Sequence, residues 1–271
     1  MCLARGILKK NKITPLVGDY AQITITDKEK KEGVIEEILA RKNEIKRPKM
    51  ANLTNLILVI SMNMPSPDLK LLDKQLVFAN HLKIKPIIVL NKIDLEQNEK
   101  IEEIANIYEK IGYKVIKTNS KENKNIDEVK ENLTQGITAF AGNSGVGKST
   151  LLNAIFKKTL AIEGEISTKN KKGKNTTTNV TLYKYNENIY IADTPGFSTF
   201  EINEISKEEL STHFPEFINF LNECEFLGCS HIKENKCKVK EAVENGQIDK
   251  IRYENYIKIY QELKEAEERK W

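Results

Sequence analysis

Residues 142–149 read Gly-Asn-Ser-Gly-Val-Gly-Lys-Ser and fit the pattern Gly-x-x-x-x-Gly-Lys-(Ser/Thr). An apolar, strand-like stretch over 137–141 precedes them, and a helical pattern begins near Lys148. In this strand–loop–helix setting, glycines allow backbone N–H groups to wrap an anion, and the helix N-terminus adds positive potential. The segment therefore predicts a nucleoside triphosphate site, without indicating which base the nucleotide contains.

Two residues near the end of this loop have separate expected roles. Lys148 should reach the outer phosphates and act as a catalytic residue, and Ser149 should ligate Mg²⁺. The residues predicted to bind the nucleotide here are Gly142, Asn143, Ser144, Gly145, Val146, Gly147, Lys148, Ser149 and Thr150.

The order of apolar segments predicts the fold class. From Asn55 onward, apolar strands alternate with amphipathic helices, which indicates an α/β fold with a doubly wound, mainly parallel sheet. The predicted strands are 56–61, 86–90, 114–117, 137–141, 180–185 and 189–192. Short β-like stretches precede this region, and helical stretches follow it, the last over about 248–269. We expect three domains, over 1–48, 49–200 and 201–271.

A second motif selects the base. Asn91-Lys92-Ile93-Asp94 directly follows the predicted strand 86–90, at the sheet edge where ligands bind. The Asp94 carboxylate can accept hydrogen bonds from the ring N–H and the exocyclic amine of guanine, a pair that adenine does not offer. Asn91 would brace the loop, and the stem of Lys92 would cover the base. Together with the phosphate loop, this motif predicts GTP.

Weaker motifs complete the predicted site. Ser120 and Lys121 follow the next strand and resemble the loop that closes a guanine pocket. Asp193 and Gly196 fit Asp-x-x-Gly, in which the aspartate holds Mg²⁺ through water and the glycine N–H senses the third phosphate. Thr177 lies in a threonine run placed as a switch that closes on Mg²⁺ and phosphate, although such a run could equally be an edge strand.

The motifs occur in an unusual order, because the base motif precedes the phosphate loop. This order predicts a circularly permuted GTPase domain, which is tolerated because domain termini usually lie close together on the surface. The Asp-x-x-Gly motif then leads directly into the C-terminal region, so nucleotide state could be passed to that region.

Three cysteines and a histidine lie within a short C-terminal segment, spaced Cys-x4-Cys-x-His-x5-Cys. Three thiolates and an imidazole can fill a tetrahedral zinc shell with no position left for water, so we expect one structural Zn²⁺. The predicted ligands are Cys224, Cys229, His231 and Cys237.

Composition limits the remaining possibilities. The charged fraction of 30%, the hydrophobic fraction of 39% and the lack of a long apolar run are typical of a cytoplasmic protein without a membrane partner. Net charge is only +4, but lysines gather near 9–12, 28–31 and 169–174. These clusters are either solvated loops or contacts to a polyanion such as RNA.

These motifs together resemble the RsgA family, also called YjeQ or YloQ, of circularly permuted GTPases that act in maturation of the small ribosomal subunit. The resemblance is based on 15–19, 91–94, 142–149, the threonine run, 193–197, the cysteine–histidine spacing and Arg252-Tyr253. It implies an N-terminal OB-fold, here incomplete, a zinc domain, binding of GTP and GDP by a monomer, and hydrolysis stimulated by the 30S subunit with its 16S rRNA. The family usually has a histidine that positions the attacking water where this chain has Asn175, and Phe197 stands where many GTPases have a glutamine. Intrinsic hydrolysis should therefore be slow.

Two hypotheses of different kinds follow. The first is an enzyme that binds the maturing 30S subunit and is released on GTP hydrolysis. The alternative is a GTP-gated switch that binds RNA or the ribosome with negligible turnover, which Asn175 and Phe197 favour.

Overall fold

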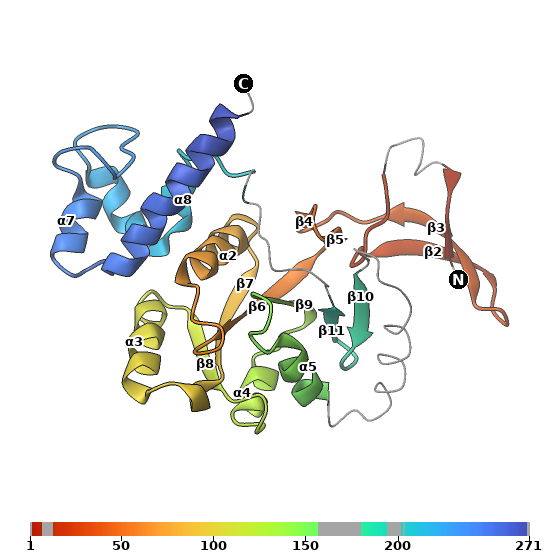
Figure 1. Cartoon of the computed structure of the whole chain (residues 1–271). Coiled ribbons are helices and arrows are strands. Elements are labelled where there is room, and N and C mark those ends of the chain that lie inside the picture. Colours follow the sequence, from red (N-terminus) through yellow and green to blue (C-terminus); the bar gives the residue numbers. More distant parts are fainter. Residues whose placement is uncertain (1, 7–12, 157–179, 194–201, 203, 270–271) are drawn as a thin grey trace. The chain divides into compact units, whose positions relative to one another are not determined.

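The computed structural model describes residues 2–6, 13–156, 180–193, 202 and 204–269 (Figure 1). The chain divides into two compact units. The first comprises Met1–Asn55, Leu133–Phe140 and Gly164–Phe197, and the second comprises Leu56–Asn132, Ala141–Glu163 and Ser198–Trp271.

Six strands form one sheet in the order β10-β11-β9-β6-β7-β8. Their bounds are β6 (Leu53–Ser61), β7 (Lys85–Asn91), β8 (Lys114–Thr118), β9 (Gly136–Ala141), β10 (Thr181–Lys184) and β11 (Ile189–Asp193). β7 pairs in parallel with β8, β9 pairs in parallel with β11, and β10 is antiparallel to β11. The predicted strands and the mainly parallel sheet are confirmed.

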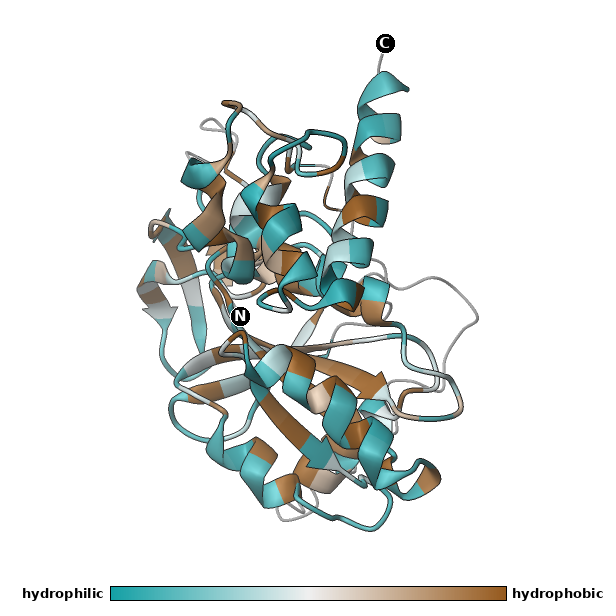
Figure 2. Ribbon diagram, turned by 90° about the vertical axis from the view of Figure 1, so that its left-hand side faces the viewer, coloured by the Kyte–Doolittle hydropathy of each residue, from teal (hydrophilic) through white to brown (hydrophobic). Residues whose placement is uncertain are grey.

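The side-chain patterns of these strands, and of the helices between them, explain which faces are buried. β6 and β7 are almost continuously apolar and buried, as expected for strands covered on both faces. In Figure 2 the central strands are brown, whereas the helices mix brown and teal because only one side of each is buried. The helices between the strands are α2 (Leu69–His81), α3 (Asn98–Glu109), α4 (Ile126–Glu131) and α5 (Lys148–Phe156).

The N-terminal part forms a three-stranded sheet in the order β1-β3-β2. β1 (Cys2–Ala4) pairs in parallel with β3 (Glu32–Ile38), and β2 (Ala21–Asp27) is antiparallel to β3. Two short strands, β4 (Glu44–Ile45) and β5 (Met50–Ala51), pair before β6 begins. The predicted small β-region is therefore present.

The C-terminal part is helical, as predicted. It contains η2 (Leu210–His213), η3 (Pro215–Glu223), α7 (Lys238–Glu244) and α8 (Lys250–Glu268). Aromatic and aliphatic side chains of these elements share one core, in which Phe214, Phe217 and Tyr256 pack ring against ring. In the portion of the chain that the structure covers, no helix has the length and apolar content needed to cross a bilayer.

Candidate nucleotide-binding site and metal centre

The phosphate loop lies between β9 and α5, as predicted. Gly142 has φ of 142°, and a Cβ atom there would lie 2.2 Å from the carbonyl oxygen of Val59. Gly147 has φ of 99°, and its Cβ would lie 2.3 Å from Nδ2 of Asn91. Both positions therefore require glycine, for the backbone angle and for the close approach of neighbouring atoms.

The Lys148 side chain folds back over the phosphate loop. Its ammonium group donates hydrogen bonds to the carbonyl oxygens of Gly142 at 2.6 Å and Asn143 at 2.8 Å. Burial lowers the pKa of Lys148, because removal from water disfavours the charged form. An anion in this loop would offset that cost.

Asn91, the last residue of β7, connects three loops and is only 1% exposed. Its Nδ2 donates to the carbonyl oxygen of Val146 in the phosphate loop at 2.9 Å. Its Oδ1 accepts from the hydroxyl of Thr118 at 3.1 Å and from the hydroxyl of Ser120 at 2.8 Å. The backbone N–H of Ser120 donates to the same oxygen at 3.1 Å. The base motif, the phosphate loop and the loop after β8 thus meet at one side chain.

The two remaining residues of the base motif lie beyond this junction. Lys92 has left-handed backbone angles, and Asp94 follows in the short helix η1 (Ile93–Leu95). Asp94 and Lys121 are both exposed. An exposed carboxylate on a turn braced to the phosphate loop can accept hydrogen bonds from a base edge.

The other predicted nucleotide-site residues are only partly covered by the structure. Asp193 is the last residue of β11, and burial raises the pKa of its carboxyl. A nearby cation would favour the ionised form and oppose this shift. Asn175, Thr177, Gly196 and Phe197 lie outside the described residues.

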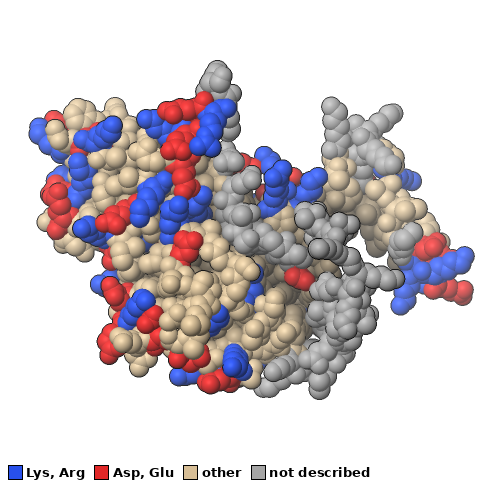
Figure 3. Space-filling view, in the orientation of Figure 1, with Lys and Arg blue, Asp and Glu red and all other residues tan. Residues whose placement is uncertain are grey.

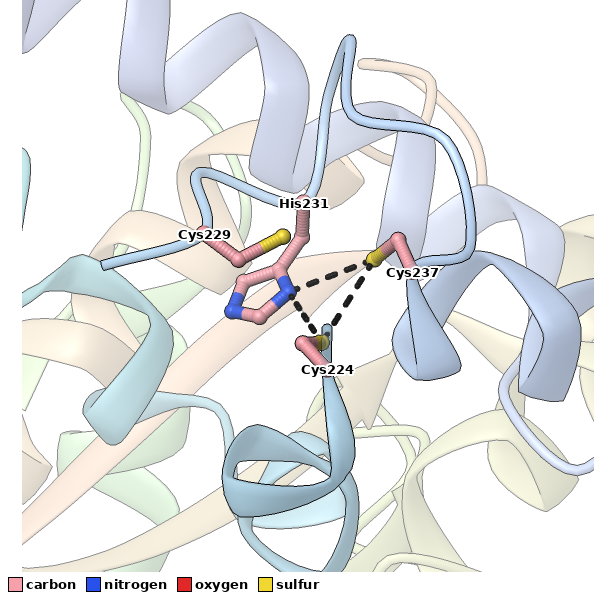
Figure 4. Close-up of side chains that lie close together, drawn as sticks. All are labelled: Cys224, Cys229, His231 and Cys237. Atoms are coloured by element: carbon pink, nitrogen blue, oxygen red, sulfur yellow. Dashed lines mark hydrogen bonds between the residues drawn. The ribbon is translucent and has the colours of Figure 1, made fainter. Parts of the chain in front are cut away.

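The four predicted zinc ligands come together, as Figure 4 shows. Their ligand atoms all lie within 4.8 Å of one another. Nδ1 of His231 is 3.5 Å from Sγ of Cys224 and 3.3 Å from Sγ of Cys237, and the two sulfurs are 3.9 Å apart. Zinc bonds of about 2.3 Å to sulfur and about 2.0 Å to nitrogen would place tetrahedral ligands roughly 3.5–3.8 Å apart. The distances among Cys224, His231 and Cys237 fit zinc, and Cys229 lies near enough to supply the fourth ligand.

The chemistry of this cluster also favours a cation. Burial raises the pKa of Cys229 to about 12, so its thiol alone would stay protonated at neutral pH. Zn²⁺ displaces such protons and binds the thiolates, which couples metal binding to folding of the segment.

Three side chains hold the ligand loop in place. The Glu234 carboxylate accepts from the N–H and the hydroxyl of Ser230, at 2.9 and 2.7 Å. The hydroxyls of Tyr253 and Tyr256, both on α8, donate to the carbonyl oxygens of His231 and Ser230 at 2.8 Å. The loop between Cys229 and Cys237 is therefore fixed by a carboxylate of its own and by two hydroxyls of α8, as expected around a metal site.

A buried charge cluster, which the sequence does not predict, joins α2 to the C-terminal helices. Arg252 is fully buried and forms ion pairs with Asp73 of α2 and Glu216 of η3. The Tyr108 hydroxyl and the Asn255 amide also donate to Asp73, at 2.9 and 2.7 Å. The guanidinium group lies 4.6 Å from the ring centroid of Phe214.

One sequence signal for this cluster exists. Positions 252, 256, 259 and 263 have helical spacing, and the last three are apolar, so Arg252 occupies the buried face of α8. Thr118 and Glu234 have no comparable signal, because a single polar residue at a strand end or in a loop is common.

A model of the RsgA GTPase family matches residues 38–203, which include both nucleotide motifs. The chain belongs to the RsgA GTPase family. A small ribosomal subunit biogenesis GTPase RsgA from Alkaliphilus metalliredigens is 44% identical over 263 residues, covering 97% of this chain and 90% of the relative. The RsgA of Clostridium botulinum strain 657 is 43% identical over 270 residues, covering 100% and 91%.

Solved structures show the same RsgA-family fold. YjeQ from Thermotoga maritima matches with a TM-score of 0.83 at 40% identity, over 97% of this chain and 89% of YjeQ. YloQ, a circularly permuted GTPase, matches with a TM-score of 0.81 at 37% identity, over 98% and 86%. The predicted fold class and circular permutation are therefore confirmed.

Proposed function

We propose that this RsgA-family GTPase binds the small ribosomal subunit and couples GTP hydrolysis to a late step of its maturation and to its own release. The observation that supports a working GTP site most directly is the set of four hydrogen bonds made by Asn91. They tie the guanine motif to the phosphate loop and to the loop after β8. The similarity to small ribosomal subunit biogenesis GTPases of other bacteria supports the ribosomal role.

In this proposal each part of the site has one task. Asp94 accepts from the guanine edge, and Lys148 together with the loop N–H groups stabilises charge on the phosphates. Ser149, Thr177 and Asp193, the last through water, are suited to hold Mg²⁺, which neutralises phosphate charge when bound. Asn175 can hydrogen-bond the attacking water but cannot accept its proton at neutral pH, so hydrolysis without a partner is slow.

The C-terminal segment is proposed to be a structural zinc domain, following a GTPase domain over 49–200 and an OB-fold-like β-domain over 1–48. The donor set and its spacing support zinc. A maturing 30S subunit with its 16S rRNA would be bound by the monomer in the cytoplasm.

Multiple-turnover phosphate release with purified protein, with and without 30S subunits, tests this function. Stimulation by 30S subunits supports the enzyme. GTP-dependent 30S binding without turnover would favour the gated switch. A protein that did not bind GTP, or did not bind 30S subunits, would refute both the enzyme and the switch.

A further inference from the structure

The loop between β6 and α2, residues 62–68, touches both halves of the proposed GTP site. At its start, the N–H of Met62 donates to the carbonyl oxygen of Asn91 at 2.9 Å. The side-chain amide of Asn63 donates to the carbonyl oxygen of Leu95, also at 2.9 Å. The ammonium group of Lys92 donates to the carbonyl oxygen of Met64. Three successive residues thus contact the turn that contains Asp94.

The end of this loop contacts the phosphate loop. The Asn143 amide donates to the carboxylate of Asp68 at 3.3 Å. The same carboxylate caps α2 by accepting from the N–H of Leu71 at 2.9 Å. The ring of Pro65 approaches Gly145, since a Cβ atom there would lie 3.7 Å from the proline Cδ. The loop therefore spans from the base-reading turn to the phosphate loop.

We propose that Asn63 is a positioning residue for guanine recognition, which acts by fixing the turn that holds Asp94. Asn91 holds this turn from its first residue, but η1 itself has no side-chain cap. Leu95 follows Asp94 directly, so the bond from Asn63 fixes the backbone just beyond the carboxylate. Without it, the backbone just after Asp94 loses its side-chain hydrogen bond, and Asp94 samples positions from which it cannot meet both guanine donors. This inference rests on the proposed GTP function.

Asp94 should accept from the ring N–H and from the 2-amino group, and inosine nucleotides lack the second. Loss of the Asn63 bond should therefore weaken GDP binding more than IDP binding. A neutral hydrogen bond contributes about 0.5–1.5 kcal/mol, so roughly fivefold weaker GDP binding is expected for Asn63→Ala. The GDP-to-IDP preference should fall by roughly threefold, because the recognition of the 2-amino group is lost first.

The test is calorimetric titration of the full chain with GDP and with IDP. Asn63→Asp is nearly isosteric but lacks the N–H donor, so it should lose selectivity like Asn63→Ala. Asn132→Ala is the matched control, because Asn132 is also half-buried and its amide donates to a backbone carbonyl, that of Glu128, at 2.9 Å. The control should leave both affinities and the preference unchanged.

Two outcomes separate this inference from the proposed function. If the wild type prefers GDP to IDP and both Asn63 variants keep that preference, Asn63 does not position Asp94 and the inference is overturned, even if both affinities fall together. If the wild type shows no preference, Asp94 does not read the 2-amino group, and the proposed base recognition fails first. A steady-state measurement adds a second readout, since a positioning role predicts a higher KM for GTP with little change in kcat.

Discussion

Arg252 offers the sharpest test of how α2 is held against the C-terminal helices. The change Arg252→Met keeps an apolar stem of similar length but removes the charge that faces Asp73 and Glu216. The Arg252 side chain is 1% exposed, and those of Asp73 and Glu216 are 0% and 7% exposed. Burial already raises the pKa of Asp73, so its carboxylate is costly to keep ionised without the guanidinium group.

The magnitude follows from this burial. Removal of one partner from a buried ion pair costs about 3–5 kcal/mol, because the other charge is left uncompensated. For a chain of this size that corresponds to roughly 6–20 °C in melting temperature. The nearby surface pair of Lys70 and Glu262 has side chains 42% and 40% exposed, so Lys70→Met should cost at most about 1 kcal/mol. Figure 3 shows acidic and basic side chains beside one another over the C-terminal helices, where such exposed pairs are common.

Urea unfolding followed by circular dichroism, in zinc-containing buffer, measures both variants against the wild type. The double variant Asp73→Asn/Arg252→Met should lose less stability than the sum of its single changes, because no full charge remains at position 73. If Arg252→Met lost no more stability than Lys70→Met, the charges would be reached by water in solution, and the reasoning from burial would be refuted.

Four further changes test the nucleotide and metal sites. Asp94→Asn should weaken GTP binding and gain binding of xanthosine triphosphate, because an amide can donate to the xanthine oxygen; unchanged GTP preference in a competition titration would remove Asp94 from the pocket. Purified protein should contain about one zinc per chain by metal analysis, and Cys229→Ser should lose most of it and expose the C-terminal region to protease while GTP binding persists; zinc-free wild type would contradict the site. Glu234→Ala should weaken zinc binding by roughly tenfold or more in a chelator competition, since it frees the Ser230 backbone. Asn175→His should raise 30S-stimulated phosphate release by roughly tenfold with a smaller effect on basal turnover; an equal or lower stimulated rate would mean that another group positions the water.

The sequence predicts the strands and the motif positions well because both depend on local patterns. The apolar runs over 56–61 and 86–90 are typical of buried strands, and the glycines at 142 and 147 adopt the positive φ angles that their motif requires. The cysteine–histidine spacing likewise predicts a metal cluster, because the four ligands lie close together in the chain.

Long-range polar contacts were not predictable in this way. Asn63 and Leu95 are 32 residues apart, and Asp73 and Arg252 are 179 residues apart, so no local pattern links them. A single asparagine after a strand is typical of a turn, and an aspartate in a helix is usually exposed. Their partners become visible only when the packing of α2, η1 and α8 is known.

Helix α2 contacts both the phosphate loop and α8. Its N-terminal cap, Asp68, bonds to Asn143 of the phosphate loop, and five residues later Asp73 is buried against Arg252 of α8. The next residues of α8 in turn fix the zinc loop, through the hydroxyls of Tyr253 and Tyr256. The phosphate loop is therefore linked to the loop that supplies His231 by three sets of polar contacts, which the backbones of α2 and α8 connect. Separation of α8 from α2 would break this ion pair and expose the apolar core that Val77 of α2 shares with Tyr256 and Ile259 of α8. Small rearrangements at the phosphate loop should therefore move the two helices together, because parting them costs more than shifting them.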